Sequence, residues 1–70
     1  MDDMDDLILE ILRDNGLTMS LNSITSELKR RNVDVGEINV WQRLNYRDHL
    51  AGHGVYQTVA WSGVVYGISE

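Results

Sequence analysis

The apolar residues of the first fifteen positions recur at steps of three and four, which places them along one side of a helix. Acidic residues at the start of this run favour the positive end of the helix dipole, and Asn15-Gly16 offers a left-handed ending. The pattern therefore predicts a first helix over residues 2–15. Its apolar stripe consists of Met4, Leu7, Ile8, Ile11 and Leu12.

A second, shorter helix is predicted to begin near residue 20. Ser20 or Asn22 can cap it, and a basic ending at Arg31-Asn32 suits the negative end of the dipole. Residues 17–19, between the two helices, are long enough only for a connector or a minimal strand. The buried stripe of this helix is expected to be Leu21, Ile24 and Leu28.

A third helix is predicted over about residues 35–50, because Asp34 and Glu37 have the spacing of a capping box and Gly52 and Gly54 follow the segment. On a helical projection one arc is apolar and consists of Val40, Trp41 and Leu44, with Ile38 at its margin. We expect this arc, including Trp41, to lie in the core. The opposite arc is polar and holds Asn39, Gln42, Arg43 and Tyr46.

Residues 55–69 are rich in valine, tyrosine and tryptophan and are divided by Ser62-Gly63, which predicts a β-hairpin. In its second arm Val64, Tyr66 and Ile68 share one face, whereas alternation in the first arm does not decide which set faces inward. No proline or linker divides the chain. The pattern predicts one α+β domain over residues 1–70, with three helices followed by a hairpin.

Composition changes this picture chiefly through charge. The chain of 70 residues has a net charge of −5, which opposes binding to nucleic acid. Four aspartates precede the first apolar run, however, whereas residues 20–50 carry five basic against four acidic side chains. The centre of the chain can therefore approach a phosphate backbone while its beginning repels it.

Other features of composition bound the class of protein. No cysteine is present, which excludes disulfides and cysteine-based zinc sites. Apolar runs are short and no signal peptide is evident, so we expect a soluble, cytoplasmic protein without membrane contact. Lysine is rare among the basic residues, a bias reminiscent of proteins from salt-loving archaea. A domain this small is only marginally stable alone, which favours a homodimer.

Three helices and a hairpin, with a four-residue turn between the second and third helices, follow the order of a winged helix-turn-helix. Residues 24–28 resemble a positioning helix, 33–35 its turn, 39–44 a recognition helix and 63–70 the closing strand of a wing. On these residues the chain resembles winged helix-turn-helix transcriptional regulators, above all small repressor-like proteins of haloarchaea and their phages. It departs from them at Arg47, where members carry leucine, and over residues 48–54.

The resemblance implies a dimeric regulator, a repressor, that binds double-stranded DNA with its third helix in the major groove. Asparagine, glutamine and arginine can form paired hydrogen bonds with base edges. The expected base contacts are Asn39, Gln42, Arg43 and Tyr46. The expected contacts with the DNA backbone are Thr25, Lys29, Arg30, Arg47, Trp61 and Ser62.

Different interpretations of the same residues stay open. The polar arc is also typical of a solvated helix face, Arg30 and Arg31 of a helix end, and Trp61 of packing on the first helix or on a dimer partner. The fold could serve as a protein-interaction module that contacts its partner through the acidic N-terminus or the wing. An acidic mimic of DNA is a weaker alternative, since the negative charges gather at one end.

Catalysis and cofactor binding have little support in the sequence. His49 and His53 have the four-residue spacing of a metal-binding pair on one helical face, but Gly52 is expected to break the helix between them. No nucleophile with a base, phosphate-binding glycine loop or carboxylate pair in a pocket is evident. We therefore expect neither an enzyme nor a bound metal or cofactor.

Overall fold

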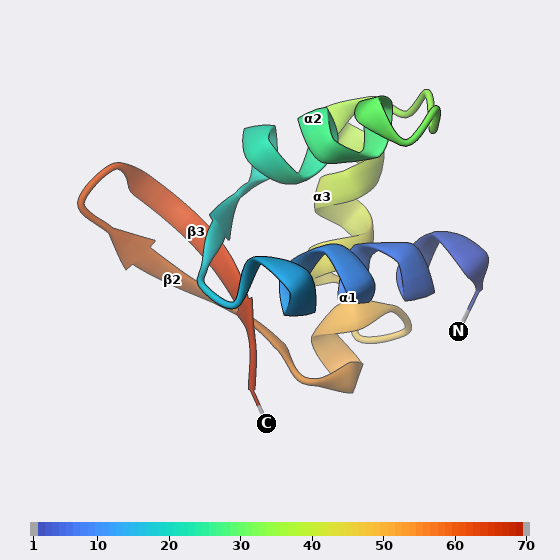
Figure 1. The fold of residues 1–70 in the computed structure, drawn as a ribbon. Coiled ribbons are helices and arrows are strands. Elements are labelled where there is room, and N and C mark those ends of the chain that lie inside the picture. The colour runs from blue at the N-terminus through green and yellow to red at the C-terminus, as the bar shows by residue number, and fades with distance from the viewer. Residues whose placement is uncertain (1, 70) are drawn as a thin grey trace.

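The computed structural model describes residues 2–69 and contains three α-helices and three strands. The helices pack together, and the last two strands form a hairpin that projects from them (Figure 1). In chain order the elements are α1 (Asp3–Asn15), β1 (Met19–Ser20), α2 (Leu21–Arg30), α3 (Glu37–Asn45), the 3-10 turn η1 (Leu50–His53), β2 (Val55–Ala60) and β3 (Gly63–Ile68).

The strands form one antiparallel sheet in the order β1-β3-β2. The minimal strand considered for residues 17–19 is present but lies at Met19–Ser20, where Met19 pairs with Tyr66. The predicted hairpin is also confirmed, with its turn at Trp61 and Ser62. This α+β arrangement is consistent with a winged-helix layout. No helix among the described residues is both long and apolar enough to cross a membrane.

The first two helices end where their capping residues indicate. Asp2 accepts a hydrogen bond from the backbone N–H of Asp5 at the start of α1, and Gly16 ends the helix in the left-handed conformation with φ 71°. Ser20 accepts from the N–H of Ser23 at the start of α2. Local sequence therefore determines both ends of α1 and the start of α2.

The core lies between the three helices and the base of the hairpin. Tyr66 is its largest fully buried side chain, and its hydroxyl accepts from Asn45 Nδ2 at 3.0 Å and donates to Gln57 Oε1 at 3.1 Å. These bonds join α3 to both strands of the hairpin. The most deeply buried apolar residues around it are Ile8, Ile11, Leu12, Ile24, Leu28, Val40, Leu44 and Leu50.

The third helix is shorter than predicted and lacks the expected capping box. It begins at Glu37 after Gly36, with no side-chain cap, and ends at Asn45 rather than near residue 50. Continuation of the helix would turn Leu50 about 100° away from the buried arc of Val40 and Leu44. The chain instead leaves the helix at Tyr46 and folds into η1, where Leu50 is fully buried. Residues 46–54 form this junction between α3 and β2.

The prediction that Trp41 is a core residue is wrong. Trp41 is 40% exposed, and its ring meets Tyr46 edge to face with centroids 6.2 Å apart. The buried arc of α3 contains Val40 and Leu44, so Trp41 lies at its margin. Register puts Val64 on the same face as buried Tyr66, as expected, but the hairpin extends past the core and leaves Val64 exposed.

Replacement of Tyr66 by phenylalanine tests the junction between α3 and the hairpin. Loss of the hydroxyl removes two partly buried hydrogen bonds and is expected to lower the free energy of unfolding by about 1–2 kcal/mol in urea denaturation. Tyr56→Phe is the matched control, because no hydrogen bond of the Tyr56 hydroxyl occurs within residues 2–69. Equal stability of the two variants would show that the hydrogen bonds of the Tyr66 hydroxyl do not stabilise this junction.

Candidate nucleic-acid interface

The polar side of α3 faces an open depression of about 300 Å³ at the N-terminal end of α1. All four residues predicted to contact bases border it, so the structure brings them together. Asn39 and Gln42 come from the helix itself, whereas Tyr46 follows its last residue. The complete lining is Met4, Val35, Asn39, Gln42, Arg43, Tyr46 and His49.

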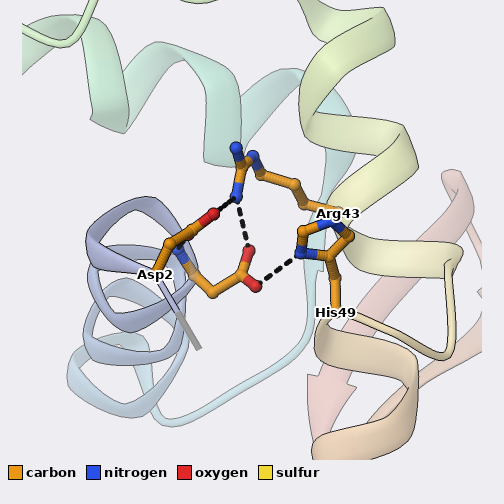
Figure 2. A network of polar contacts seen from close by, with 4 residues as sticks. Asp2, Arg43 and His49 are labelled. Carbon is orange, nitrogen blue, oxygen red and sulfur yellow. Dashed lines mark hydrogen bonds and ion pairs between the residues drawn. The ribbon is translucent and has the colours of Figure 1, made fainter.

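The Arg43 side chain does not extend freely into solvent, because carboxylates of the same chain bind its guanidinium. Its Nη1 donates to Asp2 Oδ2 at 2.5 Å and to Asp5 Oδ1 at 3.1 Å, and the side chain is 26% exposed. Figure 2 shows its guanidinium directed toward α1. Within residues 2–69 no hydrogen bond involves Nε or Nη2, so part of the donor set stays available.

Asp5 is the centre of this network and is fully buried. Its second carboxylate oxygen lies 2.7 Å from Nδ1 of His49, in the segment after α3. A buried carboxylate is costly unless charged or hydrogen-bonding groups surround it, and here both oxygens have partners. This role of Asp5 was not predicted from the sequence, although Asp5 stands three residues before Ile8 on the apolar side of α1, where an acid needs a partner.

Asp2 forms the exposed half of the network. Its hydrogen bond with Arg43, followed by that with the Asp5 backbone, lowers the pKa of its carboxyl from 3.8 to about 2. The same hydrogen bond raises the pKa of the Arg43 guanidinium. Since the folded pKa of Asp2 lies below its unfolded value, this ion pair stabilises the fold above about pH 4, and its contribution disappears between pH 4 and pH 2.

Asp2, Asp5 and His49 offer ligand atoms within 4.8 Å of one another, the arrangement that a metal ion needs. The cationic guanidinium of Arg43 already contacts both carboxylates, however. A metal ion would have to displace this charge, so we do not assign a metal site here. His53, the other half of the histidine pair considered from sequence, is exposed in η1 and does not belong to this group.

The residues predicted to contact the DNA backbone differ in their burial and in their ion pairs. Thr25 is buried and its hydroxyl donates to the Leu21 carbonyl at 2.9 Å, so the expectation that it contacts DNA is wrong. Lys29 and Arg30 are exposed at the end of α2, and Arg30 pairs with Glu27 at 3.4 Å. Arg47 is exposed and forms no ion pair within residues 2–69.

The hairpin turn carries the other two predicted contacts, Trp61 and Ser62, and both are exposed. Trp61 has a relative exposure of 105%, so it does not pack on α1 within one chain. Arg31, which was also interpreted as a residue that stabilises a helix end, pairs with Glu10, Asp14 and Glu27.

Comparison with protein-family models, curated proteins and solved structures finds no match to this chain.

The ion pair of Asp2 has a pH-dependent signature. Asp2→Asn keeps a good helix cap but removes the charge that contacts Arg43, so the variant should be less stable than the wild type at pH 7. The difference should vanish as the pH falls from 4 to 2, measured by urea denaturation across that range. Asp3→Asn removes the same charge from the same turn without a contact to Arg43 and should not reproduce this loss. Parallel curves for the wild type and Asp2→Asn would contradict the ion pair.

Proposed function

We propose that this chain is a cytoplasmic DNA-binding transcriptional regulator, a repressor, that reads the major groove of double-stranded DNA with α3 as a homodimer. The observation that carries the proposal is the convergence of Asn39, Gln42, Arg43 and Tyr46 on one open depression beside α3. The projecting hairpin adds a second element that can reach the duplex, as in a winged helix (Figure 1).

The chemistry of these side chains supports base recognition. A helix fits the major groove, where the amides of Asn39 and Gln42 can pair with an adenine edge. Arg43 suits guanine through its uncommitted Nε and Nη2 atoms, because the Asp5 carboxylate holds Nη1 and limits the freedom of the guanidinium. Lys29, Arg30, Arg47 and Ser62 would contact phosphates and supply affinity without sequence preference.

A protein-interaction module is the second candidate, and exposed apolar side chains favour it. Ile38 and Trp41 on α3 are 66% and 40% exposed, and the paired carboxylates reduce the positive charge that Arg43 presents. A partner protein would bury this apolar surface, and its affinity would not depend on Gln42. The two candidates therefore predict opposite effects of the same substitution.

The direct test selects duplexes from a random-sequence pool with the wild-type protein and measures binding by fluorescence anisotropy. Replacement of Asn39 and Gln42 by alanine should lower discrimination between selected and unselected duplexes at least about tenfold, since one bidentate base contact contributes about 1–3 kcal/mol. Thr18→Ala, an exposed position between α1 and β1, should bind like the wild type.

Backbone amide shifts during DNA titration, in dilute and in near-molar potassium chloride, provide an independent measurement. DNA binding predicts shifts along α3 that weaken as salt rises. No enrichment of any duplex and no shift at either salt concentration, with a folded protein, would overturn the proposal and favour the interaction module.

The contact between Asp2 and Arg43 predicts a gain of affinity. Asp2 repels phosphates and occupies a donor of Arg43, so Asp2→Asn should bind the selected duplex more tightly than Asp3→Asn, although each variant loses one negative charge. The expected excess is about twofold to fivefold, the range for loss of one exposed ion pair. Equal affinities would mean that Asp2 acts only through its overall charge.

A further inference from the structure

The β2–β3 hairpin is free of charged side chains in a chain that is otherwise rich in them. Residues 54–69 contain no aspartate, glutamate, lysine or arginine, whereas 24% of the whole sequence is charged. Several apolar side chains of this hairpin face solvent. These are Tyr56, Val59, Trp61 and Val64, with relative exposures of 43%, 77%, 105% and 46%.

One edge of the sheet is open along β2. The strand order β1-β3-β2 leaves β2 with a neighbour on one side only. The Ser69 N–H donates to the Gly54 carbonyl at 2.7 Å, and hydrogen-bonded pairs alternate along an antiparallel ladder. The intervening residues therefore direct their backbone N–H and C=O groups away from β3. These residues are Val55, Gln57 and Val59.

Natural sheets protect such edges with lysine, proline, bulges or a covering segment. Over Val55–Ala60 the strand has no charged residue or proline, and its pairing with β3 is continuous from Val55 with Ile68 to Ala60 with Gly63. Among the described residues, no backbone hydrogen bond from another element reaches Gln57 or Val59. The edge is thus able to accept another strand.

We propose that β2 pairs antiparallel with β2 of a second copy of this chain, so that two three-stranded sheets join into one. The N–H and C=O groups of Gln57 and Val59 allow a two-fold axis at Thr58, where Gln57 of one protomer pairs with Val59 of its partner. An antiparallel strand pair is self-complementary, as a two-fold interface requires. In this register Trp61 lies beside the partner's Val55. The exposed indole ring of Trp61 would then be part of the dimer interface.

Charge opposes a second copy less at this edge than at the acidic surfaces of the chain. Each chain carries −5, so two copies repel one another wherever their acidic surfaces meet. The hairpin brings no ionic side chain to the contact, and it buries the apolar groups that solvent otherwise surrounds. This inference rests on the homodimer of the proposed function, and locates its interface, but it does not depend on DNA binding.

Sedimentation equilibrium tests the interface over micromolar to near-millimolar protein, in dilute and near-molar potassium chloride. The wild type should reach twice the 8.0 kDa of one chain, more readily in high salt, which screens the repulsion. Val59→Lys places two like charges near the axis and should raise the dissociation constant at least about tenfold. Leu17→Lys is the matched control, because Leu17 is also 77% exposed and lies outside the hairpin.

Val59→Pro separates edge pairing from apolar contact, because it removes a backbone N–H that points away from β3. This variant should also be monomeric while circular dichroism shows the wild-type fold. A monomeric wild type at every concentration and salt would overturn the proposal. Dimers that persist in both Val59 variants would overturn it too, since the copies would then meet on another surface.

Discussion

The buried carboxylate of Asp5 is the constraint on which the arrangement of the helices depends. A carboxylate that leaves water needs cationic or hydrogen-bonding groups at both oxygens, and α1 itself supplies no cation near Asp5. Arg43 comes from α3 and His49 from the segment that follows it. The early end of α3 and the burial of Leu50 in η1 are both compatible with this network, because the chain must turn for His49 to reach Asp5.

The same network sets the electrostatics of the candidate interface. Arg43 lines the depression between α3 and the start of α1, but Asp2 and Asp5 hold one of its nitrogens. The side chain is thereby oriented, and the positive charge it offers to phosphates is reduced. Recognition would then depend more on hydrogen bonds to bases, and on the avidity of a dimer, than on electrostatic attraction.

The parts of the fold that sequence predicted are those that local chemistry determines. Gly16 ends α1 and Ser20 caps α2 through local hydrogen bonds, and the alternation around Ser62-Gly63 is enough to indicate a hairpin. The end of α3 and the exposure of Trp41 were predicted wrongly, because they depend on which element covers each flank of the helix.

The candidate site was predicted as a set of residue types but not as a network. Asn39, Gln42, Arg43 and Tyr46 do border one depression, whereas Thr25 is buried. The partners of Asp5 lie 38 and 44 residues away along the chain, beyond the reach of any periodic pattern. An acid on an apolar stripe indicates that a partner exists and leaves its identity to the tertiary structure.

A double-mutant cycle of Asp5→Asn and Arg43→Gln, measured by urea denaturation at neutral pH, tests most directly whether this buried pair ties α1 to α3. If the pair ties the two helices, the two losses of stability are not additive, with a coupling of about 1–3 kcal/mol between the side chains. Additive losses would contradict this role of the pair, because the stability of the fold would then not depend on contact between the two residues.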